Sequence, residues 1–440
     1  MELRKRQNVS LSSSGDSLKS SRSSSPESKG AKIDRNFTRC IILAFLALTS
    51  ALLVLPLAYP DSLSQFLDLF GLEPRVHAVV IDAGSTGSRV LAFTFKRDFS
   101  AENQLKLVDE LWKQVKPGLS AFAQEPAKAG QSVQELLDAA KERIPSKYWA
   151  QTPIALKATA GLRLLPAEQS EAIIDEVKKV LENSGFQPSD KLIEIMNPME
   201  EGLFAWFTVN YLLGHFDAGK KLGQSAASLD LGGGSTQITF APEKFPVQGI
   251  EGRKHFIHEV NILEKEPWSV YSHSYLGLGL MAAREAIFVQ EGSKSSCVLQ
   301  PLNFNFHGNS YDIVSKADSN FENCLEVVKK VIDNNQVHKP DELQGREIVA
   351  FSYFYDLAIE AGLISGLEGS VKLSDYKKAA EMACQNKATR FICLDLTFLF
   401  GLLKHGYGLP ESKNIKLYKK INGHEASWAL GVGYHMIHSH

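Results

Sequence analysis

The chain has 440 residues, more than one small domain needs and suited to two packed lobes with an additional segment. Its 48 basic and 50 acidic residues nearly cancel, which excludes the basic face of a nucleic-acid-binding protein. Hydrophobic residues make up 44% of the chain, enough to bury sizeable cores.

The N-terminal region predicts a cytosolic tail and a membrane anchor. Residues 1–39 are rich in serine and poor in apolar residues, so we expect a disordered tail. Residues 40–59 carry no charge and approach the roughly 20 residues that span a bilayer. Basic residues precede this run and Asp61 follows it, which places the C-terminal part on the luminal or extracellular side. A signal peptide cleaved near Ala58 is the alternative, although the preceding tail is long for one.

After a short stalk at residues 60–75, one pattern occurs twice. Residues 79–90 contain an apolar strand, Asp82, a glycine-rich turn with hydroxyl residues and a second apolar strand, and residues 228–239 repeat this order around Asp230. Glycines let backbone N–H groups approach an anion, and an aspartate at a strand end can hold a hydrated cation. Two such loops favour a phosphate chain held between two related halves, with two unrelated hairpins as the alternative.

Between and beyond these loops, strands and helices alternate, which predicts an α/β fold. The expected elements are a helix at 131–144, a strand at 153–157, a helix at 167–184, a strand at 191–196, an amphipathic helix at 203–213, a hairpin from 226, an aromatic cluster at 351–356, helices at 374–385 and 395–405, and a closing helix at 427–434.

Five cysteines divide between the anchor and the late part of the chain. Cys40 lies in the apolar run, whereas Cys297, Cys324, Cys384 and Cys393 lack the paired spacing of a zinc site. In an oxidising compartment, nearest neighbours in sequence form the simplest pairs, Cys297–Cys324 and Cys384–Cys393. Three pairings are possible, and four buried free thiols are expected instead if the domain is cytosolic.

Phosphoanhydride hydrolysis needs a phosphate clamp, charge neutralisation and a water aimed at phosphorus. The two glycine loops can form the clamp, and Asp82 and Asp230 can hold a divalent cation through its waters. Glu200 and Glu201 follow Pro198 where a strand meets a helix, so either could act as a base. The alternative is that both are helix-start carboxylates favoured by the helix dipole.

Five stretches, in order, match signatures of a known family. They are Ile81–Arg89, Lys157–Leu165, Met199–Leu213, Ser228–Thr239 and Ser427–Gly433. On these stretches the chain resembles the apyrase family, the nucleoside triphosphate diphosphohydrolases of the actin/hexokinase superfamily. The run Phe351–Asp356, the four late cysteines and the single anchor make it most similar to the endoplasmic reticulum and Golgi nucleoside diphosphatases.

The resemblance implies two ribonuclease-H-like lobes with the active site in the cleft between them. Lobe I would comprise residues 76–198 and 424–440, and lobe II residues 199–423. Glu201 would be the base that activates water, needing no upward pKa shift, while Ser235 and Gln237 would position that water. Asp82 and Asp230 would hold hydrated Ca²⁺ or Mg²⁺. Phosphate contacts would come from Ser85, Thr86, Gly87, Ser88, Arg89, Gly232, Gly233, Gly234, Thr159 and Arg163.

Tyr353 and Tyr355 are candidates for stacking on the nucleobase, with core packing as the alternative. The resemblance implies a single-pass type II protein of the Golgi or endoplasmic reticulum that hydrolyses UDP, GDP or IDP to the monophosphate and phosphate, supporting glycosylation. Secretion after cleavage is an alternative location. Alternative functions are a broader tri- and diphosphatase, a phosphotransferase of the same superfamily or an inactive nucleotide-binding protein.

Overall fold

The computed structural model divides the chain into two compact units, residues 1–66 and 67–440. It describes residues 42–46, 49–50, 75–98, 104–216, 221–243, 256–260, 267–306, 308–386 and 390–438. In the first unit the described residues, 42–46 and 49–50, are helical, and the rest of the predicted anchor and the predicted tail lie outside the described residues. Of the predicted stalk, only Arg75 is described. Among the described helices, none has the length and apolar composition to cross a bilayer.

The first sheet of the second unit has five strands in the order β3-β2-β1-β4-β5. Strand β2 pairs antiparallel with both β1 and β3. Strand β4 pairs in parallel with β1 on one side and with β5 on the other. Strands β1 and β4 are almost fully buried, as expected for the apolar runs at their positions. The bounds are β1 Arg75–Ala83, β2 Ser88–Asp98, β3 Gln104–Val115, β4 Pro153–Ala158 and β5 Gln187–Ile195.

Helices α3 (Pro126–Arg143) and α5 (Ala167–Glu182) cover one face of this sheet and share its core. Apolar residues of α3 recur at helical spacing and are buried. The helix begins five residues before the predicted start, with Pro126 in its first turn, where a missing N–H costs nothing. Short helices connect these elements: α4 Ala160–Arg163, η1 Leu119–Phe122 and η2 Ser146–Gln151.

The second sheet has seven strands in the order β14-β15-β13-β6-β7-β9-β8. The strands are β6 Ala227–Leu231, β7 Ser235–Phe240, β8 Ile257–Val260, β9 Trp268–Leu276, β13 Ile348–Ser352, β14 Glu368–Lys372 and β15 Asn414–Tyr418. Their core is shared with α7 Leu280–Glu291, α8 Phe321–Asn334, α9 Tyr353–Glu360, α10 Leu373–Ala383, α11 Ile392–Gly401 and the π-turn Leu402–Gly406. Smaller elements are η3 Leu222–Gln224, η5 Asp341–Gly345, β10 Lys294–Ser295, β11 Leu302–Phe306, β12 Asn309–Ser315, β16 Lys420–Ile421 and β17 His424–Glu425.

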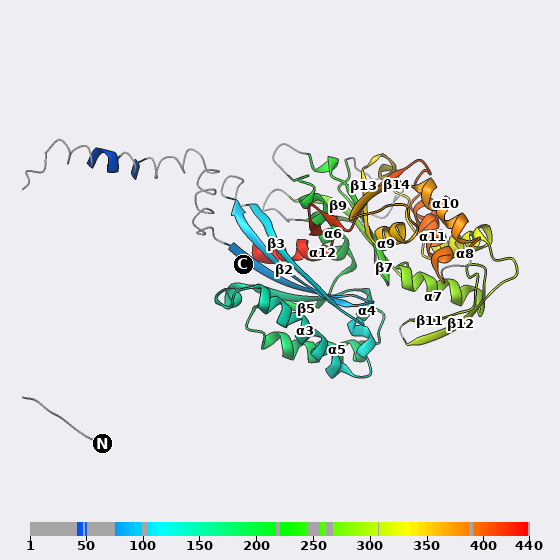
Figure 1. Ribbon diagram of the computed structural model, residues 1–440, viewed down its shortest axis with the longest axis horizontal. Helices are drawn as coiled ribbons and strands as arrows, with labels where there is room; N and C mark the ends of the chain where they lie inside the picture. Colours follow the sequence, from blue (N-terminus) through cyan, green and yellow to red (C-terminus); the bar gives the residue numbers. More distant parts are fainter. Residues whose placement is uncertain are drawn as a thin grey trace, which may run out of the picture. The chain divides into compact units, whose positions relative to one another are not determined.

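Helices α6 (Pro198–Leu212) and α12 (Trp428–His438) form a third core between the two sheets (Figure 1). The backbone of Gly431 lies so close to α6 that a Cβ there would be 2.6 Å from the carbonyl oxygen of Phe204. The predicted helix at 203–213 is confirmed as part of α6, but the prediction that it is amphipathic is wrong. Side chains are buried around nearly the whole circumference of α6, because α12 packs on one side and β7 and β9 on the other.

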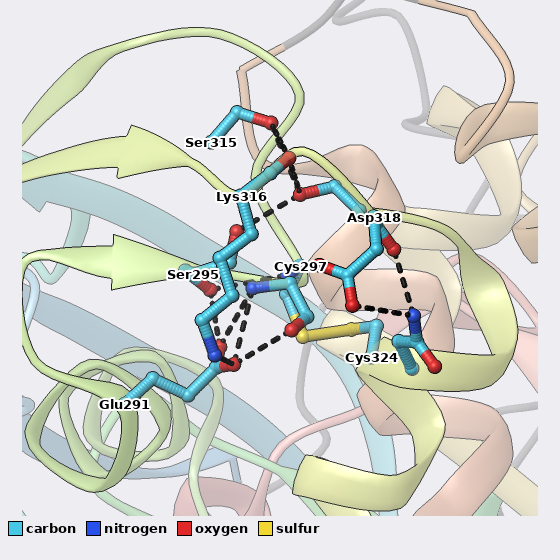
Figure 2. A network of polar contacts seen from close by, with 10 residues as sticks. Glu291, Ser295, Cys297, Ser315, Lys316, Asp318 and Cys324 are labelled. Carbon is cyan, nitrogen blue, oxygen red and sulfur yellow. Dashed lines mark hydrogen bonds and ion pairs between the residues drawn. A yellow bond between two sulfur atoms is a disulfide. The ribbon is translucent and has the colours of Figure 1, made fainter.

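Two disulfides lie in the part of the chain that follows β9. Cys297 pairs with Cys324 and Cys384 with Cys393, which confirms the nearest-neighbour pairing. Figure 2 shows the first disulfide beside the buried carboxylate of Glu291, which accepts hydrogen bonds from Ser295 Oγ at 2.6 Å and Lys316 Nζ at 2.6 Å. The Ser295 hydroxyl in turn accepts a hydrogen bond from the backbone N–H of Cys297, so these polar contacts hold the backbone of Cys297 in place.

We expect the two disulfides to contribute unequally to stability. The Cys297–Cys324 bond spans 27 residues and the Cys384–Cys393 bond spans 9. Loop-closure entropy predicts a loss of about 3–4 kcal/mol in the free energy of unfolding for the Cys297→Ser/Cys324→Ser variant and about 2–3 kcal/mol for Cys384→Ser/Cys393→Ser. Denaturant unfolding of the three proteins measures this, and a larger loss from the shorter loop would contradict the prediction.

Candidate active site

The two glycine loops, one from each sheet, meet face to face. A Cβ on Gly233 would lie 2.4 Å from Ser85 Oγ and 3.1 Å from Thr86 Cγ2, so glycine is needed for this approach. The hairpins correspond residue by residue: Asp82 pairs with Arg89 across β1–β2, and Asp230 pairs with Gln237 across β6–β7. The two predicted cation residues therefore occupy equivalent positions on opposite sides of one gap.

Two further segments, one at Gly161 in α4 and one at Gly118, pack closely against the loop that follows β1. A Cβ on Gly161 would lie 2.8 Å from Ser85 Cα, and one on Gly118 would lie 2.3 Å from the carbonyl oxygen of Gly84. The backbone N–H of Thr159 donates to the carbonyl oxygen of Ala83 at 3.2 Å. The loop after β1 is thus held from three directions, which preorganises its N–H groups.

A cavity of about 330 Å³ lies between the lobes at these loops. Its wall includes residues of the two loops and of the segments around Glu201: Asp82, Gly84, Ser85, Thr86, Arg89, Thr159, Ala160, Glu201, Asp230, Leu231, Gly232, Gly233, Gly234 and Ser235. The remaining wall residues are Trp112, Gln114, Lys116, Ser352, Tyr353, Tyr355, Asp356, Tyr418, Lys419, Glu425, Ala426, Ser427 and Trp428. Most of the predicted site residues therefore share one cavity.

Glu201 lies in the first turn of α6 and faces this cavity. Gly202 lets the start of α6 approach β7 and β9, since a Cβ there would lie 2.5 Å from Thr239 Oγ1. The Glu201 carboxylate accepts a hydrogen bond from Arg163 Nη2, and both side chains are about nine-tenths buried. Arg163 Nε and Nη1 are buried without a partner in the described part of the chain, so they can still donate to an anion.

Burial raises the pKa of Glu201 to about 7, opposed by Arg163 and reinforced by Asp230 and Asp82. The sequence expectation of an unshifted glutamate is therefore wrong. Since α6 is enclosed by α12 and the second sheet, the carboxylate loses its water, and Arg163 does not fully compensate. A base with a pKa near neutral is well matched to accepting a proton from water.

Gln237 lies on β7, next to Gly202 of α6 and outside the residues that line the cavity, and belongs to a small hydroxyl network. Its Nε2 donates to Ser235 Oγ at 2.8 Å and to Ser274 Oγ at 2.9 Å. Its Oε1 is buried and has no partner among the described residues, which leaves an acceptor for a water hydrogen. Ser274 lies opposite Gln237 in the β7–β9 pair, a contact that only the sheet register reveals.

Asp82 and Asp230 provide oxygen donors of the kind that hydrated Ca²⁺ or Mg²⁺ prefers. Asp230 Oδ1 is buried and, within the described residues, has no partner, so this oxygen fits a cation-bound water. Burial raises the pKa of Asp230 to about 6, which a hydrogen bond from Ser352 opposes. Burial also raises the pKa of Asp82, opposed by Arg89, whose Nη1 donates to Asp82 Oδ2 at 2.7 Å. Arg89, which is predicted to contact phosphate, is thus bonded to the Asp82 carboxylate in this structure.

Three predicted phosphate residues, Gly87, Ser88 and Arg163, lie outside the cavity wall, although Arg163 is bonded to Glu201, which is part of it. Ser88 begins β2 and is fully buried, and Gly87 is used within its own turn, where its carbonyl oxygen accepts from the N–H of Gly84 at 3.1 Å. Tyr353 and Tyr355 both reach the wall. The Tyr355 hydroxyl donates to the carbonyl oxygen of Gly366 at 2.6 Å, which fixes its ring.

Several wall residues were not among those predicted from the sequence. Trp112, Gln114 and Lys116 alternate along and just beyond β3, so they share one face, a period-two signal that was available. Ser352 has a left-handed backbone, φ +56°, at the break between β13 and α9. A non-glycine residue in this region is strained, and such strain gathers at functional sites.

Two facing glycine loops, paired carboxylates and a buried glutamate around one cavity are the groups that binding of a phosphate chain with a divalent cation needs. The sequence profile of the GDA1/CD39 (nucleoside phosphatase) family matches residues 72–439, and the chain belongs to this family. It is therefore a nucleoside phosphatase.

Individual proteins that are similar to this chain carry names of nucleotide hydrolases. Ectonucleoside triphosphate diphosphohydrolase 5 of Gallus gallus is 38% identical over 381 residues, covering 82% of this chain and 88% of the relative. Ectonucleoside triphosphate diphosphohydrolase 6 of Mus musculus is 41% identical over 383 residues, 82% of each chain. Nucleoside diphosphate phosphatase ENTPD5 of Homo sapiens is 36% identical over 384 residues, 83% of this chain and 88% of that one. A solved nucleoside triphosphate hydrolase of Neospora caninum shares the fold, with TM-score 0.60 and 15% identity over 86% of this chain and 96% of that chain.

The contact between the two loops predicts the effect of a single methyl group. Gly233→Ala places a Cβ against Ser85 and Thr86, so the loops must separate, and we expect phosphate release to fall by about 100-fold. Gly345→Ala is the control, because a Cβ there meets nothing within 4 Å. Equal activity of the two variants would show that the loops need not touch.

Proposed function

We propose that this nucleoside phosphatase hydrolyses nucleoside diphosphates such as UDP, GDP and IDP to the monophosphate and phosphate, with Ca²⁺ or Mg²⁺. The observation that carries the proposal is the single cavity in which both glycine loops, Asp82, Asp230 and Glu201 converge. The names of the 36–41% identical relatives, nucleoside diphosphate phosphatase among them, support the diphosphate substrate.

In this mechanism water attacks the terminal phosphorus directly. Glu201 accepts the proton of the water, Gln237 Oε1 accepts its other hydrogen, and Ser235 holds the amide of Gln237 in place. The new oxygen–phosphorus bond forms as the bond to the bridging oxygen breaks, and the monophosphate leaves. Backbone N–H groups of residues 84–86 and 232–234 donate to the phosphate oxygens, with Thr159 in the same wall and Arg163 behind it, bonded to Glu201.

Asp82 and Asp230 are the residues that would hold the cation, through its waters. A bound divalent cation would neutralise charge on the phosphate oxygens. Arg89 would then exchange its contact with Asp82 for the substrate phosphate. Tyr353, also in the cavity wall, would provide a stacking surface for the base. We call the wall residues assigned to the base in this proposal, Trp112, Tyr353, Tyr355, Asp356, Tyr418, Lys419 and Glu425, the nucleoside end of the cavity.

The two disulfides support a luminal catalytic part, because such bonds persist in oxidising compartments. We place the enzyme in the Golgi or endoplasmic reticulum as a single-pass type II protein, where it would remove the diphosphate left by glycosyltransferases. Protease protection of the C-terminal part in sealed microsomes tests this topology, and cleavage without detergent would contradict it.

The decisive experiment is phosphate release by the full chain in detergent. UDP, GDP, IDP, ADP, CDP and the triphosphates are compared with Ca²⁺, with Mg²⁺ and with a chelator. We expect cation-dependent release from diphosphates, independent of any sugar or acetate acceptor. Stronger release from triphosphates would favour a broad apyrase, and a requirement for an acceptor would favour a phosphotransferase.

The raised pKa of Glu201 predicts the pH dependence of this reaction. Because the base acts unprotonated, kcat/KM should increase with pH up to about 7 and then level off. Arg163 lowers the pKa of Glu201, so Arg163→Gln should move the rising limb of the pH profile of kcat/KM to higher pH. Profiles of kcat/KM for both proteins measure the shift, and a limb that moves to lower pH would exclude Glu201 as the titrating group.

A further inference from the structure

One carboxylate at the nucleoside end of the cavity has no part in the phosphate chemistry. Asp356 lies three residues after Tyr353 in α9, so the two side chains are on the same helix face, and both contribute to the cavity wall. The left-handed backbone of Ser352 turns the chain so that α9 starts at this wall. A base stacked on Tyr353 would lie beside Asp356, and we infer that its edge faces this carboxylate.

The Asp356 carboxylate is not engaged by the protein. Within the described residues it has no hydrogen-bond or ion-pair partner, and the same holds for the ammonium group of Lys419, which also lines the cavity. Asp356 is exposed to the cavity, where desolvation raises its pKa and Lys419, then Arg89 and Lys116, oppose this shift. All three cations line the same cavity wall. Of the three, Arg89 is bonded to Asp82.

An acceptor beside a donor matches only some nucleobases. Uracil, guanine and hypoxanthine carry a lactam edge, an N–H donor next to a carbonyl oxygen. Cytosine and adenine reverse this edge, with a ring-nitrogen acceptor next to an amino donor. A carboxylate facing the ring nitrogen and an ammonium facing the exocyclic oxygen would pair with the first group and oppose the second.

We propose that Asp356 and Lys419 form a base-reading pair that selects nucleotides with a lactam edge. This inference rests on the proposed function and deepens it, because it assigns the preference for UDP, GDP and IDP to two residues outside the phosphate site. Each contact is a hydrogen bond to a charged group, and loss of one should change discrimination by about tenfold to a hundredfold.

Glu425 is the other carboxylate at this end, and it is the less suitable one. Burial and the neighbouring Glu110 raise its pKa to about 7, and its backbone N–H is bonded to Glu110 Oε1 at 3.0 Å. Glu425→Gln therefore enters the test as a comparison, and a loss of base preference in that variant alone would overturn the assignment to Asp356.

The experiment compares matched pairs of substrates on the full chain. UDP and CDP differ only at the edge in question, as do IDP and ADP, so the ratio of kcat/KM within each pair measures edge reading alone. Asp356→Asn should reduce both ratios by at least about tenfold, because an amide can accept from a lactam or donate to a ring nitrogen. Lys419→Met should reduce them in the same direction.

Two controls separate specificity from folding. Glu360→Gln removes an exposed carboxylate one turn further along α9, away from the cavity wall, and should leave both ratios unchanged. On the unaltered enzyme, 3-methyl-UDP lacks the N–H donor and should be used as poorly as CDP. Wild-type release that is equal within the pairs, 3-methyl-UDP used as well as UDP, or an unchanged ratio in Asp356→Asn would each overturn the inference. Absence of release from every diphosphate would instead remove the proposed function.

Discussion

Replacing Glu201 by glutamine is expected to lower kcat for phosphate release by about 100- to 10,000-fold, the range for loss of a general base. The amide keeps the size of the side chain and can still accept from Arg163 Nη2 through its carbonyl oxygen, so the cavity should keep its shape. It cannot take the proton of the attacking water. KM should change little, because Glu201 acts on water and not on the ground-state nucleotide.

The neighbouring residue supplies the matched control. Glu200 lies one position earlier in α6 and points to Lys191, with its carboxylate 3.8 Å from Lys191 Nζ. Glu200→Gln removes the same charge at the same helix end, so any effect of the helix dipole is shared by both variants. We expect it to retain nearly full activity. If both variants lost activity equally, the carboxylates would act through the helix terminus and the water-activating role of Glu201 would fail.

The sequence predicted the parts of the site that depend on local chain geometry. Asp82 and Asp230 each stand at a strand end before a glycine turn, and a repeated pattern over twelve residues predicts two equivalent hairpins. Pairing of the four late cysteines also followed from proximity in the chain. In these cases residues close in sequence determine the contact, so no tertiary information is needed.

Contacts between distant segments could not be predicted in this way. The bond from Arg163 to Glu201 joins α4 to α6, and the helix that carries Glu201 packs against α12, more than 200 residues later. The pattern of α6 suggested one apolar face because only its own residues were considered. Its polar members Thr208 and Asn210 are buried, since they bond to the backbone N–H of Gly431 and to Ala226. Tertiary packing overrides helix periodicity there.

The nucleoside end of the cavity illustrates the same limit. Trp112 comes from β3 of the first sheet, Asp356 from α9 and Glu425 from the segment before α12. No motif links these positions, and each alone resembles an ordinary surface residue. Assembly of the two sheets around α6 and α12 brings them into one cavity wall. The base selectivity that we propose would therefore depend on the lobe arrangement, whereas the proposed phosphate contacts lie within the two hairpins.

Replacing Asp230 by asparagine should have opposite effects on stability and on cation binding. The folded-state pKa of about 6 exceeds the ordinary value of 3.8, so the native state binds more protons between these values and loses stability as pH rises through them. At pH 7 the buried charge thus destabilises the cation-free protein, and Asp230→Asn should raise the free energy of unfolding by about 1–3 kcal/mol.

The same substitution removes half of the carboxylate charge available to the cation. We expect Asp230→Asn to lose at least about 100-fold in kcat and to lose the increase in Tm that Ca²⁺ gives the unaltered protein, because a ligand stabilises only the state that binds it. Thermal unfolding with Ca²⁺ and with chelator measures both effects. Asp395→Asn is the contrast: Asp395 is equally buried, but Arg284 Nε donates to its Oδ1 at 2.8 Å. That variant should lose stability and keep its response to Ca²⁺, so a Ca²⁺ response retained by Asp230→Asn would place the cation elsewhere.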